Sequence, residues 1–112
     1  MAYTIESAFQ HEHVHEVLQF LSEYRFMLGD LQTVITIRLY RPITGERVVV
    51  FRQSHFISTP TQATPYMTSR PWNDTEAAAI NQVVSAMNDH YRDAINAGKI
   101  PDESWLTPNA SF

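Results

Sequence analysis

Apolar residues recur every three or four positions in the first quarter of the chain, which is the spacing of an amphipathic helix. Ser7, followed by Gln10 three residues later, forms a capping-box pattern that places the start of this helix near Ala8. Gly29 can adopt the left-handed conformation that ends a helix. We therefore predict a first helix over residues 8–28. Its apolar stripe comprises Val14, Val17, Leu18, Leu21, Tyr24 and Leu28.

The pattern changes to alternation after residue 33, which is typical of β-strands. β-Branched and aromatic residues fill segments 33–40 and 47–57, and Pro42 and Gly45 lie in the turn between them. We predict that these segments pair as a β-hairpin. One face would carry Ile35, Ile37, Leu39, Val49 and Phe51, and the opposite face Val34, Thr36, Arg38, Tyr40, Val48, Val50, Arg52 and Phe56.

A second run of helical spacing predicts another amphipathic helix over residues 74–97. Asn73, with Glu76 three residues later, supplies an N-terminal cap. Gly98 closes the helix, and Pro101 lies just beyond it. Its apolar stripe comprises Ala77, Ile80, Val84, Met87, Tyr91, Ala94 and Ile95.

Two segments show neither the helical spacing nor the alternation of a strand. Residues 58–71 form a long loop rich in Thr and Pro, and such a long connection in a compact domain is often functional. Residues 99–112 form a polar C-terminal tail, which Trp105 and Leu106 are expected to hold against the core.

Together these elements predict a single α+β domain over residues 1–112. An antiparallel hairpin-based sheet would pack against two amphipathic helices in the order helix-strand-strand-helix. Because two strands alone are marginal in water, the sheet needs cover at its edges. Extra short edge strands could form at residues 3–5 or around Tyr66. Pairing of strand edges or helices between copies of the chain would also cover them, so we expect a homo-oligomer.

Composition narrows the function classes. A chain of 112 residues with a net charge of −4 can form one modest core and lacks the basic balance of a general nucleic-acid-binding protein. There is no cysteine, so the sequence excludes disulfides, thiolate nucleophiles and cysteine metal sites, and we expect a cytoplasmic protein. No stretch approaches the roughly 18 apolar residues that span a membrane, and no secretory signal is visible. We therefore expect no membrane partner.

Residues 11–15 read His-Glu-His-Val-His, which is an H-E-x-x-H pattern. On a helix this pattern places His11 and His15 one turn apart on the same face. Zinc metalloproteases use such a pair as metal ligands, while the intervening glutamate, here Glu12, activates the metal-bound water. A third ligand would have to come from Glu23, Asp30, His55 or His90.

Several features favour a solvated helix start over a zinc site at this pattern. About ten residues precede it, which leaves no room for the strands that normally support a metalloprotease helix. His13 and Glu16 also place polar groups where such helices are apolar. A catalytic zinc site, with His11 and His15 as ligands and Glu12 as base, is thus the alternative hypothesis. A non-catalytic metal-binding or pH-sensing role is a further one.

Arginine is concentrated in the predicted hairpin, where four of the seven arginines lie between residues 38 and 52 and only Glu46 opposes them. Guanidinium groups bind carboxylates or phosphates, while neighbouring aromatic rings stack on bases or pack against apolar groups. The interpretation is an anion-binding face comprising Arg38, Tyr40, Arg41, Arg47, Arg52 and Phe56. Alternatively, these arginines are ordinary strand residues that pair with carboxylates and discourage edge aggregation.

We therefore expect a small non-enzymatic binding or interaction protein without catalytic residues or a cofactor. Its hairpin face and the 58–71 loop would contact a nucleotide, a nucleic acid or an acidic surface of a partner protein. A small zinc-dependent hydrolase is the alternative function, and a structural subunit of a larger assembly is the third.

Overall fold

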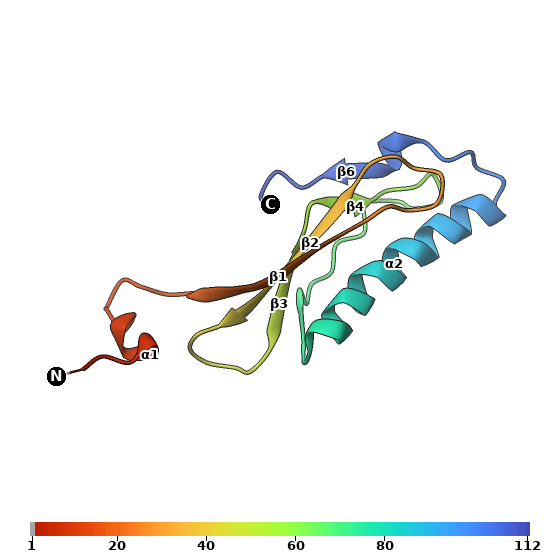
Figure 1. The fold of residues 1–112 in the computed structure, drawn as a ribbon. Helices are drawn as coiled ribbons and strands as arrows, with labels where there is room; N and C mark the ends of the chain where they lie inside the picture. The colour runs from red at the N-terminus through yellow and green to blue at the C-terminus, as the bar shows by residue number, and fades with distance from the viewer. Residues whose placement is uncertain (1) are drawn as a thin grey trace.

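The computed structural model describes residues 2–112 and shows antiparallel sheets beside one long helix (Figure 1). In chain order the elements are α1 (Ile5–Ala8), β1 (Leu18–Phe26), β2 (Ile35–Pro42), β3 (Val49–Gln53), β4 (His55–Ile57), β5 (Trp72–Asn73), α2 (Glu76–Asn96), the 3-10 helix η1 (Glu103–Trp105) and β6 (Leu106–Pro108). One sheet has the strand order β1-β2-β3-β5, and β4 and β6 form a second. The predicted α+β class is confirmed. The predicted pair of long helices is wrong, and the expected helix-strand-strand-helix order does not describe the chain.

The first predicted helix, over residues 8–28, is strand β1 along most of its length. β1 pairs antiparallel with β2, and the register shifts between Phe20 and Ser22, which marks a β-bulge at Leu21. Leu18 opposes Pro42, on the side of the sheet that carries Arg38, whereas Tyr24 opposes Ile37 on the buried side. The helical spacing of Leu18, Leu21 and Tyr24 therefore combines apolar residues from both faces of a bulged strand, which explains the wrong prediction.

The predicted hairpin is confirmed in β2 and β3, which pair antiparallel with Arg38 opposite Arg52 and Tyr40 opposite Val50. Its predicted apolar face forms the core against α2, and these residues are all buried: Ile35, Ile37, Leu39, Val49 and Phe51. Each such side chain contributes about 1.5–3 kcal/mol when it leaves water. We call this the inner face of the sheet, and the side that carries Arg38 and Arg52 the outer face.

The second hairpin strand is shorter than the predicted 47–57, because the pairing with β2 ends at Ser54. The Ser54 hydroxyl accepts a 2.8 Å hydrogen bond from the N–H of Thr36, and the Ser54 N–H donates to the Thr36 carbonyl at 2.9 Å. A side chain thus replaces a backbone acceptor at this position. The chain then leaves the first sheet and continues as β4, which pairs with β6.

Helix α2 is the second predicted helix, slightly shorter than the expected 74–97. Its N-cap is Thr75 instead of Asn73, and the Thr75 hydroxyl accepts a 3.1 Å hydrogen bond from the N–H of Ala78. Asn73 lies in β5, where its amide donates to the Gln82 side chain at 3.0 Å. The helix buries Ala79, Val83, Met87 and Ala94 against the sheets.

Residues 58–71 contain no helix or strand, and the extra edge strand β5 follows them instead of forming around Tyr66. Residues 3–5 lead into α1 and form no edge strand. Trp105 and Leu106, which the sequence places on the core, are both buried. The tail therefore contributes η1 and β6 to the folded body.

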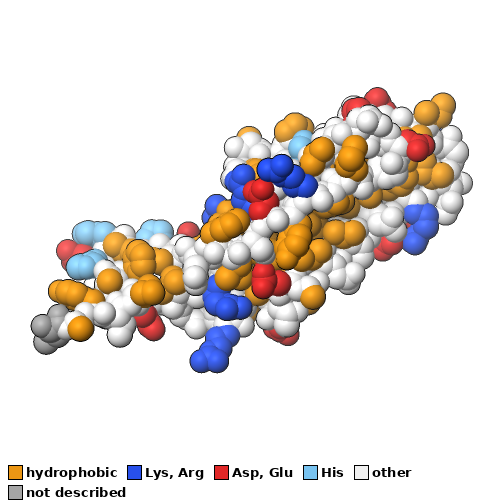
Figure 2. Space-filling model, in the orientation of Figure 1, with side chains coloured by type: hydrophobic (Ala, Val, Ile, Leu, Met, Phe, Trp, Pro, Cys, Tyr) orange, Lys and Arg blue, Asp and Glu red, His pale blue; other side chains and the backbone are white. Residues whose placement is uncertain are grey.

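Residues 2–15 form an arm that projects from the body of the molecule (Figure 1). The radius of gyration is 17.1 Å, whereas a compact domain of this length has about 13 Å. A capping box between Thr4 and Ser7 caps the N-terminus of α1, but no residue of this helix is buried. Figure 2 shows apolar and histidine side chains along the outside of the arm. Within residues 2–112, no helix combines the length and apolar character needed to cross a membrane.

Candidate functional site

A groove of about 640 Å³ lies beside the outer face of the hairpin, a size typical of ligand sites. The start of β1, the end of β2, β3, β4 and the loop before β5 contribute to its wall. Most of its lining residues are apolar, so the groove suits an apolar ligand body. These apolar residues are Val17, Leu18, Pro42, Val50, Phe51, Phe56, Met67 and Pro71.

Arg52 is the cation in the lining of this groove, and Glu16 is the carboxylate. The Arg52 side chain is exposed, and its guanidinium lies 5.3 Å from the centre of the Tyr40 ring. In the part of the chain that the structure describes, Arg52 forms no ion pair with a carboxylate. A cation held over a ring beside apolar side chains can anchor an anionic group of a ligand.

Arg38, which lies opposite Arg52 in the sheet, is already engaged. Its Nε donates a 2.8 Å hydrogen bond to Oε1 of Glu23, and its guanidinium lies 4.2 Å from the centre of the Phe112 ring. The hydrogen bond from Arg38 lowers the pKa of Glu23 below its ordinary value of 4.5 and raises the pKa of Arg38. Arg38 therefore links β1 to β2 through its side chain, and its charge is already paired with Glu23.

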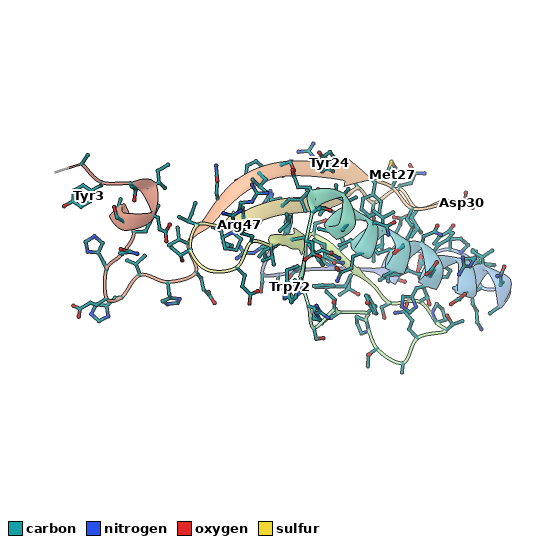
Figure 3. All side chains as sticks on the ribbon, turned by 90° about the horizontal axis from the view of Figure 1, so that it is seen from below. Tyr3, Tyr24, Met27, Asp30, Arg47 and Trp72 are labelled. Carbon is teal, nitrogen blue, oxygen red and sulfur yellow. The ribbon has the colours of Figure 1, made fainter. Side chains whose placement is uncertain are left out.

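The remaining residues of the predicted anion-binding face lie in different places. Phe56 lines the groove with Arg52, and Tyr40 contacts the Arg52 guanidinium. Arg41 and Arg47 are exposed and lie outside the groove lining. Figure 3 shows Arg47 on the loop between β2 and β3. The structure thus brings part of the predicted set together and leaves two arginines outside it.

The H-E-x-x-H residues, 11–15, lie in an irregular segment after α1 and are exposed. The helical geometry that the zinc hypothesis needs is therefore absent at His11 and His15. Within residues 2–112, no three His, Cys, Asp or Glu side chains come together as a group that could hold a metal ion. Of the candidate third ligands, Glu23 pairs with Arg38, and His55 Nδ1 lies 2.8 Å from the Ser54 hydroxyl.

The loop before β5 contributes Met67, Thr68 and Pro71 to the groove, in the segment that the sequence marks as a contact surface. The N–H of Phe51 donates a 3.0 Å hydrogen bond to the Pro71 carbonyl, which fixes this end of the loop against β3. The Thr/Pro composition and the length of the loop are the signal that identifies it in the sequence.

Sequence reasoning misses several other groove residues, among them Glu16 and Asn109. Glu16 has a φ of 54°, which is uncommon for a residue with a side chain, and the arm leaves the groove at this point. The Asn109 side chain donates a 2.9 Å hydrogen bond to the Gln53 carbonyl and so fixes the tail beside β3. No sequence pattern marks Asn109, and the helical prediction hides Glu16.

Comparison with known proteins gives no family for this chain. No protein-family model matches it, and no curated protein or solved structure matches it significantly. The geometry of the groove is therefore the basis for a functional proposal.

Proposed function

We propose that this protein is a non-enzymatic binding module whose groove holds an extended segment of a partner protein. The segment would carry one acidic side chain between apolar ones. The observation that carries this proposal is the position of Arg52, an exposed arginine without a carboxylate partner among residues 2–112, in a groove that is otherwise largely apolar.

The apolar lining and Arg52 would contribute different amounts of binding free energy. An exposed ion pair contributes only about 0–1 kcal/mol, whereas burial of one large apolar side chain contributes about 1.5–3 kcal/mol. Affinity would therefore come mainly from apolar residues of the ligand that contact Val50 and Phe56. Arg52 would fix the position of the acidic residue and reject basic segments, because its guanidinium can bind a carboxylate through two hydrogen bonds.

A partner protein fits the groove better than a nucleic acid. Nucleic-acid binding draws on several cations along a backbone of phosphates. Here Arg52 is the cation of the groove, since Arg38 is paired with Glu23 and the other hairpin arginines lie outside the lining. The net charge of −4 would also repel a polyanion.

Selection of displayed peptides tests this proposal, because a random library presents acidic, basic and apolar segments to the groove together. The library is selected in parallel on the unaltered protein, on the Arg52→Glu variant and on the matched Arg47→Glu variant. We expect the unaltered protein and Arg47→Glu to enrich peptides with Asp or Glu between apolar residues. Arg52→Glu should instead enrich Lys or Arg at that position. Selection of the same peptides by all three proteins, or of none, contradicts the proposal.

We also propose that the protein self-associates. The open outer edge of β1 supports this proposal, because β1 is the terminal strand of its sheet and pairs only with β2 in the described part of the chain. Long unpaired strand edges are natural templates for pairing with another chain.

A further inference from the structure

One edge of the four-stranded sheet is strand β1, which is nine residues long, and the opposite edge strand, β5, has two residues. Helix α2 packs mainly against β2, β3, β4 and β5, so it lies to one side of the sheet. β1 reaches the helix through a 2.7 Å hydrogen bond from the Ser22 hydroxyl to Glu76. In Figure 3, Tyr24 and Met27 lie along this outer edge.

The inner side of β1 is correspondingly open. Ile37 is completely buried, yet Tyr24, directly opposite it in the register, is 49% exposed. Met27, just beyond the strand, is 52% exposed. An aromatic residue on a half-covered sheet face, beside a free backbone edge, marks a surface that another strand can extend.

Charges along β1 select one way of pairing two copies. Glu23 and Arg25 both lie on the outer face, because they oppose Arg38 and Thr36 of β2. When two identical strands pair antiparallel with their inner faces on the same side, one residue lies opposite its own copy. If that residue is Glu23 or Arg25, like charges face each other, which destabilises the pair.

A two-fold axis at Tyr24 gives the opposite result. It places Glu23 opposite the partner's Arg25, and Arg25 opposite the partner's Glu23. Both Tyr24 rings then meet on the open inner face. The strand is thus self-complementary in charge at this register and at neither adjacent one.

We propose that the protein forms a symmetric dimer through antiparallel pairing of β1 with β1 of a second copy, centred on Tyr24. This inference rests on the proposed self-association and adds its register. Arg25, whose side chain is 70% exposed and lies 3.2 Å from Glu23 of its own chain, would contact the partner's Glu23 in the dimer. The two sheets would join into one continuous sheet with an α2 helix on each side of the axis.

Charge variants test the register by sedimentation of the full chain. The Arg25→Glu variant places four carboxylates at the centre, so we expect its dimer dissociation constant to rise by about tenfold or more. The Glu23→Arg variant places four guanidinium groups there, so its dimer should also dissociate. An equimolar mixture of the two variants restores opposite charges at both positions, so we expect a heterodimer to form. Circular dichroism of each variant checks that it is folded.

Single cysteines provide a second test, because the natural chain has none. Opposed residues of antiparallel strands have Cα atoms about 4.5–5.5 Å apart, which suits a disulfide. The Tyr24→Cys variant should therefore form a disulfide-linked dimer rapidly under mild oxidation. Phe20→Cys is the control: its exposure is similar, but the two copies would lie about 20 Å apart in this register.

The two tests separate the register from self-association itself. A monomer at all concentrations, with no faster cross-linking of Tyr24→Cys than of Phe20→Cys, overturns both proposals. A dimer that is unaffected by Arg25→Glu, or that cross-links faster through Phe20→Cys, overturns the register and leaves self-association standing.

Discussion

Arg38 and Arg52 lie directly opposite each other on β2 and β3, yet of these two residues only Arg38 pairs with a carboxylate among residues 2–112. Two neighbouring arginines on one sheet face thus have different environments. Arg38 links β1 to β2 through Glu23, whereas Arg52 faces the groove. This difference separates a residue that stabilises the sheet from one that is available to a ligand.

Substitution of Arg38 should therefore lower the stability of the fold, whereas substitution of Arg52 should weaken ligand binding. Arg38→Gln removes the 2.8 Å hydrogen bond to Glu23, so we expect a lower melting temperature with little change in binding of peptides selected on the groove. Arg52→Gln should leave the free energy of unfolding within about 0.5 kcal/mol of the natural protein and weaken peptide binding. Thermal unfolding followed by circular dichroism, with Arg47→Gln as the control, measures the first effect. Equal destabilisation by both variants would contradict the division of roles.

Gly29 lies against the ring of Tyr91, and its φ is +50°. A Cβ at this position would meet the Tyr91 hydroxyl and ring, and the ring cannot move freely because it packs edge-on against Trp105 at 5.8 Å. We expect Gly29→Ala to lower the free energy of unfolding by about 2 kcal/mol or more, from backbone strain and overpacking together.

Gly45→Ala is the matched control for this effect. Gly45 has a φ of +92°, but nothing lies within 4 Å of the added Cβ. This variant should show only the backbone strain, about 1 kcal/mol. Urea unfolding measures both variants, and an equal loss in the two would mean that the contact with Tyr91 has no energetic effect.

Glu103, in η1, binds Gln32 and Thr33 in the segment before β2. Its carboxylate accepts hydrogen bonds from the Thr33 hydroxyl at 2.7 Å, the Gln32 N–H at 2.9 Å and the Thr33 N–H at 3.0 Å. The bond from the Thr33 hydroxyl, followed by those from the backbone, lowers the pKa of Glu103 below its ordinary value of 4.5. The stabilisation is therefore present above about pH 4.5 and is lost as the pH falls through the lowered pKa.

The Glu103→Gln variant should be less stable than the natural protein at pH 7, and the difference should shrink as the pH falls below 4.5. Urea unfolding at a series of pH values measures this difference. Glu46→Gln is the control, because no hydrogen bond or ion pair of the Glu46 side chain occurs in the described part of the chain. A destabilisation by Glu103→Gln that stays constant with pH would contradict this account.

The N-terminal arm should contribute little to the stability of the body. No residue of α1 is buried, and the backbone hydrogen bonds of residues 8–14 stay within the arm. We expect removal of residues 2–14 to leave the melting temperature almost unchanged. His11→Ala with His15→Ala should behave likewise. A clear loss of stability on truncation would show that the arm packs against the body.

The strands that alternate without interruption are those that sequence reasoning predicts correctly. In β2 and β3 apolar residues occupy alternate positions over 35–39 and 49–51, and Ile37 and Phe51 are buried as expected. In β1 apolar residues lie on both faces and the bulge at Leu21 interrupts the alternation, so the local pattern indicates the wrong element. The aromatic residues Phe20 and Phe26, which fall off the helical stripe, are the signal for a strand.

The candidate site was predictable in part for a similar reason. Alternation alone places Arg38 and Arg52 on one face, and both lie there. The alternation cannot show that Glu23 forms an ion pair with Arg38, because that contact depends on β1 being a strand beside β2. The alternation also cannot predict that Asn109 lies at the groove, since its hydrogen bond to Gln53 joins residues far apart in the chain.

A charge exchange between Arg52 and a bound peptide tests the central claim most directly. The measurement is the dissociation constant of a fluorescent peptide selected on the natural protein, compared with that of the same peptide carrying Lys in place of its acidic residue. We predict that Arg52→Glu weakens binding of the acidic peptide about tenfold and favours the Lys peptide, whereas Arg47→Glu changes neither. If the natural protein and Arg52→Glu bind the two peptides with the same preference, Arg52 does not anchor the ligand and the proposed site is wrong.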